Sequence, residues 1–224
     1  MKPSSQISKK RIYLLDDHPI VRQGLGQLIN EQADLTVCGA APDAISALQA
    51  IDELSPDLLI LDISLDGPDG LDLLKRLRLR DNPPPVLVLS MHDESLYAER
   101  ALRAGAMGYI MKQVATESLL AAIRKILGGG VYLSDGMSAR MLHQFAKGNG
   151  QAAHSPLSDL SDRELEVFRL IGEGQGTREI AELLHVSVKT VESYQAHLKE
   201  KLSLRNSREL VQRAIHWVSS NQFE

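Results

Sequence analysis

Cysteine, aromatic residues and long apolar runs are scarce in this chain of 224 residues. The single cysteine, Cys38, excludes an intramolecular disulfide and a zinc site built from cysteines. It stands in the apolar segment LTVCGA, which favours a buried small side chain over a redox centre. No apolar run is long enough to cross a bilayer, so we expect neither a membrane-embedded segment nor a membrane partner.

A signal peptide and an excess of positive charge are also missing. The first apolar run, RIYLL, ends at once in Asp16 and Asp17, which is too early for a secretory signal, so we expect a cytoplasmic protein. The formal net charge is −4, and any case for nucleic-acid binding must therefore come from local patterns. Domains commonly run to about 100–150 residues, so the length predicts two of them.

Between residues 11 and 128, short apolar runs alternate with amphipathic segments five times. The apolar runs cover residues 11–15, 35–40, 57–62, 85–90 and 108–112, and the amphipathic segments cover residues 19–29, 44–51, 70–78, 95–104 and 117–127. Parallel strands need long crossovers and read as nearly continuous apolar runs. The pattern therefore predicts an α/β domain with a doubly wound five-stranded parallel sheet.

The remainder of the chain has no strand pattern. We expect a tail at residues 1–10 and, after a run of three glycines, a linker at residues 129–157 that contains a short helix. Residues 158–224 predict a small all-helical domain. Ser161 and Glu164 form a capping-box pattern that opens its first helix, and helices are expected at 177–184, at 188–202 and after Asn206.

Polar side chains follow the predicted strands at the points where they end. Asp16 and Asp17 follow the first strand, Asp62 the third, Ser90 ends the fourth and Lys112 follows the fifth. The carboxyl ends of parallel strands share one edge, where open α/β sheets bind ligands. Carboxylates gathered there repel one another unless a cation neutralises them, which predicts a Mg²⁺ site. One carboxylate is then able to accept a phosphoryl group, with the metal and Lys112 balancing charge on the transferring oxygens and the Ser90 hydroxyl donating a hydrogen bond to one of them.

These five positions, together with LLDDHP and YIMK, resemble the receiver domain of two-component response regulators over residues 11–128. The resemblance implies that Asp62 is the phosphoacceptor and that Asp16 and Asp17 bind Mg²⁺, with the backbone carbonyl of Ser64 as a further ligand. It also implies three switch residues, which are Ser90, Tyr109 and Lys112.

Taken singly, each residue has a structural alternative, such as a helix cap for Asp16 or Asp17, a turn for Asp62 and a core aromatic for Tyr109. The segment ISLDGPDG departs from the family, which usually has Met-Pro where this chain has Leu65 and Asp66. The added charge has two opposite expected effects, namely stronger cation binding and slower phosphorylation by an anionic donor.

The region from Gly176 to Leu202 predicts a helix-turn-helix, with Ser187 capping the second helix. On that helix one face is apolar and is expected to be core; it carries Val188, Val191, Leu198 and Leu202. The opposite face carries short or polar side chains suited to the major groove. From Ser187 to Arg213 there are six basic and three acidic residues, an excess sufficient for phosphate contacts.

A helical hairpin for protein contacts is the structural alternative. The segments LSDRELEVFRLIGEG, EIAELLHVSVKTVESYQAHLKEKL and LRNSREL, however, resemble the DNA-binding domain of the NarL/FixJ (LuxR-type) regulators. The resemblance implies base contacts from the second helix, with a thymine methyl as the partner of Ala196. The implied DNA-contacting residues are Lys189, Thr190, Glu192, Ser193, Ala196, His197 and Lys201.

We therefore expect a phosphorylation-dependent transcriptional regulator and not an enzyme. Its expected partners are a cognate sensor histidine kinase, promoter DNA and a second copy of the chain. A phosphatase of the haloacid-dehalogenase type is one rival, although its Asp-x-Asp motif follows the first strand and this chain has LLDDHP there. A protein-interaction module without DNA binding is another.

Overall fold

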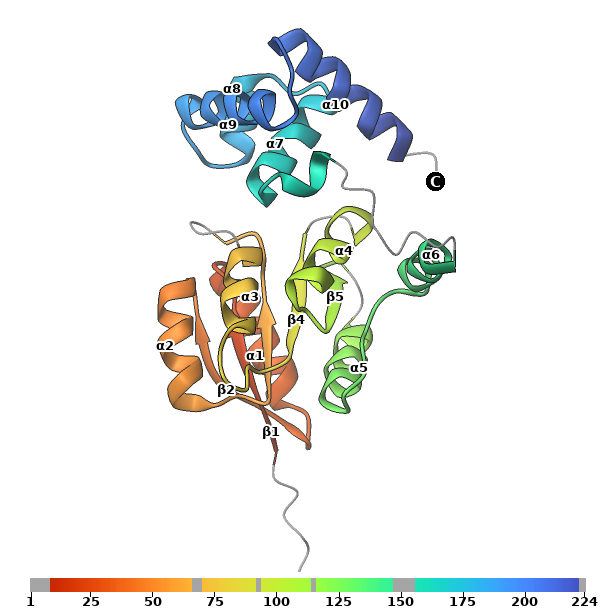
Figure 1. Ribbon diagram of the computed structural model, residues 1–224. Helices are drawn as coiled ribbons and strands as arrows, with labels where there is room; N and C mark the ends of the chain where they lie inside the picture. The colour runs from red at the N-terminus through yellow and green to blue at the C-terminus, as the bar shows by residue number, and fades with distance from the viewer. Residues whose placement is uncertain (1–8, 66–69, 92–93, 114–115, 147–155, 222–224) are drawn as a thin grey trace, which may run out of the picture. The chain divides into compact units, whose positions relative to one another are not determined.

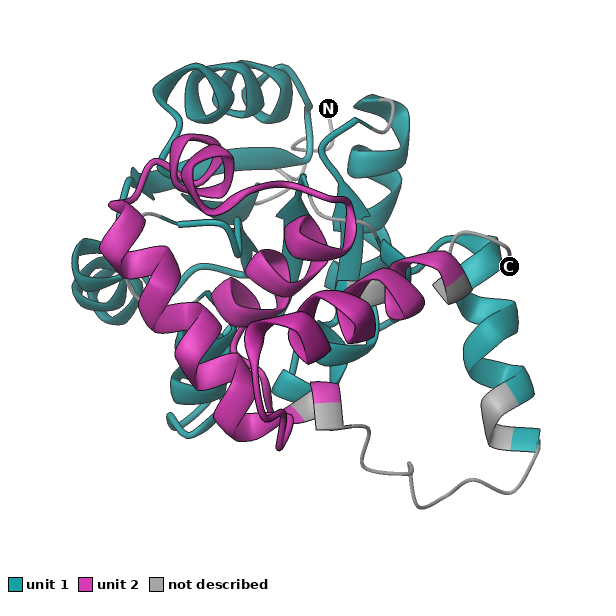
Figure 2. Cartoon of the chain, turned by 90° about the horizontal axis from the view of Figure 1, so that it is seen from above, with its two compact units in different colours: residues 1–147 teal, residues 148–224 magenta. Residues whose placement is uncertain are grey.

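The computed structural model describes residues 9–65, 70–91, 94–113, 116–146 and 156–221 (Figure 1). The chain divides into two compact units, Met1–Lys147 and Gly148–Glu224, which are coloured separately in Figure 2. No helix among these residues is long and apolar enough to cross a membrane.

Strands and helices alternate through the first unit as the apolar pattern predicts. In chain order they are β1 Lys10–Leu15, α1 Pro19–Asn30, β2 Leu35–Ala41, α2 Ala44–Leu54, β3 Leu58–Leu61, α3 Gly70–Arg78, β4 Val86–Ser90, α4 Glu94–Ala104, β5 Gly108–Met111, α5 Thr116–Leu127 and α6 Asp135–Ala146. All strands are parallel, in the order β2-β1-β3-β4-β5. This is the predicted doubly wound sheet, in which strand order reverses beside β1.

Both faces of the sheet are buried, which explains why its strands read as continuous apolar runs. One core cluster joins alternate strand residues to α1 and α5; it consists of Ile12, Leu14, Ile29, Leu35, Leu58, Ile60, Leu87, Leu89, Ile110, Leu119, Ala122, Ile123 and Ile126. The intervening strand residues, such as Tyr13, Leu15 and Tyr109, point to the opposite face and are also buried. The strands are therefore packed on both sides.

The turn after β3 depends on a glycine. A Cβ atom at Gly70, the first residue of α3, would lie 2.5 Å from the Cα of Ile63. Only glycine allows the start of α3 to approach the backbone beside Asp62 so closely. Leu65 is buried, whereas Asp66, to which the added charge belongs, lies outside the described residues.

The segment predicted as a linker at residues 129–157 contains the expected helix, α6, but its first part belongs to the first unit. Tyr132 pairs with the edge strand β5: its carbonyl accepts a hydrogen bond from the Tyr109 N–H, and its own N–H donates to Met107. Met137 of α6 is 5% exposed, and the Ser134 N–H donates to the Glu94 carboxylate of α4. Backbone pairing at an open sheet edge, which glycine-rich sequence does not reveal, accounts for the difference.

The second unit is all-helical, as predicted. Its described residues form a 3-10 turn, η1 Pro156–Asp159, and four helices: α7 Asp162–Gly172, α8 Thr177–Leu183, α9 Val188–Lys201 and α10 Ser207–Asn221. The capping box is present, because the Ser161 side chain accepts from the Glu164 N–H and the Glu164 carboxylate accepts from the Ser161 N–H. The core includes Leu165, Phe168, Ile180, Val191, Leu198, Leu210 and Ala214.

Candidate functional site

The predicted polar residues lie at the carboxyl ends of the strands. Asp16 and Asp17 follow β1, Asp62 follows β3, Ser90 ends β4 and Lys112 follows β5. Because β1, β3, β4 and β5 are consecutive neighbours in the sheet, these ends form one rim. Asp16, Asp62 and Ser90 are at most 3% exposed, so the rim places charged and polar groups where water reaches them poorly.

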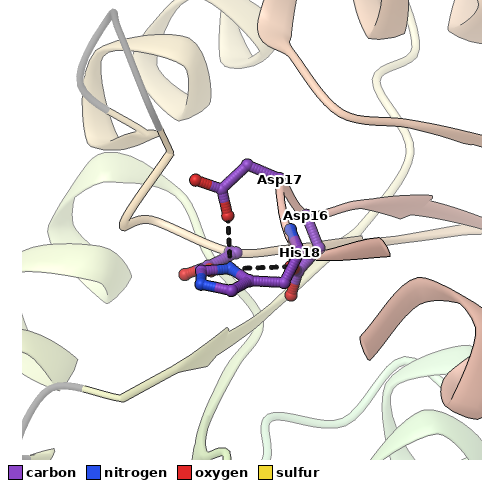
Figure 3. Close-up of side chains that lie close together, drawn as sticks. Asp16, Asp17 and His18 are labelled. Atoms are coloured by element: carbon purple, nitrogen blue, oxygen red, sulfur yellow. Dashed lines mark hydrogen bonds and ion pairs between the residues drawn. The ribbon is translucent and has the colours of Figure 1, made fainter. Parts of the chain in front are cut away.

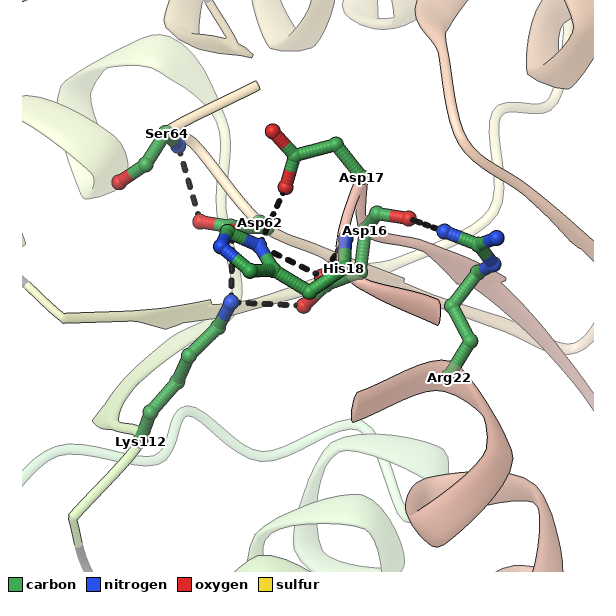
Figure 4. A network of polar contacts seen from close by, with 7 residues as sticks. All are labelled: Asp16, Asp17, His18, Arg22, Asp62, Ser64 and Lys112. Carbon is green, nitrogen blue, oxygen red and sulfur yellow. Dashed lines mark hydrogen bonds and ion pairs between the residues drawn. The ribbon is translucent and has the colours of Figure 1, made fainter. Parts of the chain in front are cut away.

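Lys112 connects two of the carboxylates (Figure 4). Its Nζ lies 2.6 Å from Asp62 Oδ2 and 2.7 Å from Asp16 Oδ2. The Lys112 side chain is only 9% exposed, so both ion pairs are shielded from solvent and are stronger than surface pairs. One ammonium thus offsets part of the charge of three carboxylates, and a net negative charge remains to attract a cation.

Burial and ion pairing shift the pKa of Asp62, and likewise that of Lys112, in opposite directions. Burial raises the pKa of Asp62 above its ordinary value, although the hydrogen bond and charge of Lys112 oppose this change. Burial alone would lower the pKa of Lys112, but hydrogen bonds to Asp16 and Asp62 more than offset it and raise that pKa. Lys112 is therefore held as the charged ammonium, and further positive charge at the rim would favour the ionised form of Asp62.

The loop after Asp62 presents polar groups to the same place. The Ser64 N–H donates to Asp62 Oδ1 over 2.8 Å, which orients the carboxylate. Ser64 Oγ is buried and has no hydrogen-bond partner among the described residues. The three carboxylates, with ligand atoms within 4.8 Å of one another, form an oxygen-rich set that suits Mg²⁺. The donor chemistry therefore fits the cation that the sequence predicts.

Two residues that the sequence interpretation missed belong to this network. His18 Nδ1 lies 2.5 Å from Asp17 Oδ1 and 3.4 Å from Asp16 Oδ1 (Figure 3), and the His18 N–H donates to Asp16 Oδ1 over 2.8 Å. Arg22 of α1 reaches back and donates to the Asp16 carbonyl. The signal for His18 was present in LLDDHP, since histidine and aspartate side chains both serve as metal ligands. Arg22 gave none.

The remaining predicted switch residues are buried. Ser90 is fully buried at the end of β4, and its carbonyl accepts from the Lys112 N–H over 2.8 Å. Tyr109 is 1% exposed within β5, two residues before the strand ends. Ser90 therefore lies at the rim. Tyr109 lies within β5 instead, and its backbone N–H donates to the Tyr132 carbonyl.

Helix α9 exposes most of the residues predicted to contact DNA. Lys189, Glu192, Ser193 and Ala196 are exposed, and Thr190 is half-buried with its hydroxyl 2.7 Å from that of the capping residue Ser187. On the predicted core face, Val191 and Leu198 are fully buried and Leu202 is half-buried.

The prediction that Val188 belongs to the core face is wrong, because this residue is 39% exposed. It is the first residue of α9. Helical periodicity assigns it to the apolar face but takes no account of its position at the end of the helix.

Lys201, predicted to contact the DNA backbone, also holds an internal ion pair. Its Nζ lies 2.7 Å from Glu164 Oε2 and donates to the Asp159 carbonyl over 3.2 Å. Glu164 is 4% exposed, and His197 Nδ1 lies 3.8 Å from its other oxygen. Lys201 thus joins the end of α9 to the start of α7.

Both units match known families. Residues 12–124 match the model of the response regulator receiver domain, and residues 158–214 match that of the bacterial regulatory proteins of the luxR family. The oxygen regulatory protein NreC of Staphylococcus carnosus (strain TM300) is 38% identical over 209 residues, covering 92% of this chain and 96% of NreC.

Solved structures agree with these matches. A LuxR-family two-component response regulator from Aurantimonas sp. SI85-9A1 is 34% identical with a TM-score of 0.57, covering 62% of this chain and 99% of that one. RcsB from Salmonella enterica serovar Typhimurium, bound to promoter rprA with the phosphomimetic BeF3−, is 26% identical with a TM-score of 0.58, covering 92% and 98%. The chain therefore belongs to the two-component response regulators of the NarL/FixJ type, which are phosphorylation-dependent transcriptional regulators with a LuxR-type DNA-binding domain and are not enzymes.

Proposed function

We propose that Asp62 is the residue that accepts the phosphoryl group, and that the acidic rim binds Mg²⁺ through Asp16, Asp17, Asp62 and the Ser64 carbonyl. The main support is the position of the Asp62 carboxylate: it is buried at the carboxyl end of the sheet and bonded to Lys112 over 2.6 Å. Ligand atoms of Asp16, Asp17 and Asp62 lie within 4.8 Å of one another. A bound Mg²⁺ supplies positive charge that offsets repulsion between the carboxylates and an anionic donor.

The phosphoryl donor is proposed to be a phosphohistidine of a sensor kinase. A carboxylate oxygen of Asp62 attacks phosphorus, the new P–O bond forms, and the P–N bond breaks with its electron pair left on the imidazole nitrogen. Lys112 moves from Asp62 Oδ2 to an oxygen of the phosphoryl group, and the Ser90 hydroxyl donates to another. These contacts, with rearrangement of Tyr109, constitute the proposed switch.

The output is proposed to be binding of promoter DNA by a homodimer in the cytoplasm. The bases are faced by Glu192, Ser193 and Ala196 of α9. Lys189 and Thr190 contact phosphates. His197 and Lys201 lie further along α9, where contacts with the DNA backbone compete with their shared partner Glu164.

Intact-mass analysis with acetyl phosphate tests the phosphoacceptor. The wild-type chain is expected to gain one phosphoryl group in the presence of Mg²⁺ and none after chelation, because the carboxylates otherwise repel the donor. Asp62→Asn is expected to gain none, while Asp72→Asn, at an exposed position of α3, serves as the matched control. Undiminished phosphorylation of Asp62→Asn would contradict the assignment.

A further inference from the structure

His18 turns its side chain toward the carboxylates and away from the helix that it precedes. It is the N-cap of α1, yet its imidazole makes no capping hydrogen bond, and Pro19 follows it at the helix start. Histidine is not among the residues favoured at this position. Its Nδ1 instead lies 2.5 Å from Asp17 Oδ1 (Figure 3). Helix capping therefore does not account for the position of the imidazole.

The spacing of the four side chains suits a single ion. One ligand atom from each of Asp16, Asp17, His18 and Asp62 can be chosen so that all lie within 4.8 Å of one another. First-row divalent metals hold nitrogen and oxygen ligands at about 2.0–2.2 Å, so two ligands of one ion are at most about 4.4 Å apart. The His18 side chain is 62% exposed and has room to rotate. Coordination requires the imidazole to turn so that Nδ1 parts from Asp17 Oδ1, because 2.5 Å is closer than two ligand atoms of one ion approach each other.

The chemistry of imidazole distinguishes among metals. Mg²⁺ prefers oxygen ligands, whereas imidazole suits the later first-row ions. We propose that His18 is a nitrogen ligand through which the acidic rim also binds Co²⁺, Ni²⁺ and Zn²⁺, and that it raises the preference of the site for these ions over Mg²⁺. This inference rests on the proposed cation site. The carboxylates serve every divalent ion alike, so the effect of His18 lies in the ratio of affinities.

Titration of the full-length chain with CoCl₂ and, separately, with MgCl₂ tests the proposal. Calorimetry gives Kd for both ions, and the visible absorption of Co²⁺ reports a change of ligands. His18→Ala is expected to raise the Kd for Co²⁺ by about tenfold or more and to alter the Co²⁺ spectrum, while the Kd for Mg²⁺ changes by less than about twofold. His143→Ala, at an exposed position of α6, is the control and is expected to match the wild type.

The outcomes are separable. An unchanged Co²⁺ affinity in His18→Ala would overturn the proposal, and so would an equal loss of Co²⁺ and Mg²⁺ affinity, which indicates that His18 only shapes the loop. His18→Gln repeats the comparison with a polar side chain of similar reach if the alanine variant does not fold. Failure of the wild type to bind Mg²⁺ would contradict the proposed function instead, and the Co²⁺ comparison would still decide the role of His18.

Discussion

Lys112 carries one positive charge between two buried carboxylates, 2.7 Å from Asp16 and 2.6 Å from Asp62. A phosphoryl group on Asp62 would replace one of these carboxylate contacts with a more highly charged one. We therefore expect the lysine to interact more strongly with the phosphorylated state, and a difference of this kind shifts a population between two conformations.

Lys112→Ala is expected to keep the phosphorylated receiver from favouring the DNA-binding state. Coupling between two sites is typically worth about 1–3 kcal/mol, so phosphorylated Lys112→Ala should bind promoter DNA about five- to 150-fold more weakly than the phosphorylated wild type. Fluorescence anisotropy in Mg²⁺, with phosphorylation checked by mass, measures the difference. Equal affinities would show that Lys112 does not transmit the signal.

Glu164 provides a pH-dependent contribution to the second unit. Burial alone would raise its pKa, but the bonds from Lys201 and from the Ser161 N–H more than offset this and lower it. A lowered folded-state pKa stabilises the fold at pH above the ordinary glutamate value, and that stability is lost as pH falls through the folded-state pKa.

Glu164→Gln is therefore expected to lower the free energy of unfolding at pH 7 by about 1–2 kcal/mol, after allowance for the partial exposure of Lys201. The difference from the wild type should shrink as the pH falls below the ordinary glutamate range. Urea denaturation of both proteins, followed by the fluorescence of Trp217, measures it. A difference that stayed constant across the acidic range would exclude this ion pair as its source.

At the scale of elements, α9 has two kinds of exposed side chain among the residues proposed to contact DNA. Lys189 is exposed and charged, whereas Ala196 is exposed, short and apolar. Phosphate contacts release counterions without reading bases, and contacts to base edges discriminate among sequences. The two positions therefore predict different consequences of substitution.

Lys189→Ala is expected to weaken binding to all DNA sequences about equally and to reduce the slope of log K against log [salt] by about 0.9. Ala196→Gln is expected instead to change base preference by about 1–3 kcal/mol at one position. Selection from randomised DNA, with salt titrations of each variant, distinguishes them. If Ala196→Gln enriched the same sequence as the wild type, α9 would be rotated relative to the proposed arrangement.

Helix α6 behaves as part of the first unit although the sequence suggests a linker. Tyr132 pairs with β5 next to Tyr109, and Ser134 contacts Glu94 at the start of α4. Residues 132–134, just before α6, are thus bonded to β5, which carries Tyr109, and to α4, which follows the strand that ends in Ser90.

At the scale of the whole molecule, one helix-turn-helix buries too little surface for specific binding at physiological salt. The phosphorylated chain is therefore expected to dimerise, with each copy reading one half-site. Sedimentation velocity with and without beryllofluoride should show a shift from monomer to dimer that Asp62→Asn abolishes. A chain that stayed monomeric with beryllofluoride and still bound a single half-site with full affinity would contradict this.

The sequence by itself determined the order of elements and the composition of the rim. Apolar runs that end in Asp16, Asp17, Asp62, Ser90 and Lys112 place these residues at strand ends, because periodicity and strand length are local properties. A parallel sheet then brings all strand ends to one edge. The capping box at Ser161 was readable for the same reason, since its two residues are three positions apart.

Only the tertiary structure decided which of these groups touch. Lys112 contacts Asp62 across 50 positions, and Lys201 contacts Glu164 across 37, at distances that depend on how whole elements pack. The attachment of α6, the exposure of Val188 and the turn of His18 toward the carboxylates have the same origin. Each depends on the ends, edges and neighbours of elements, and local periodicity carries no information about these.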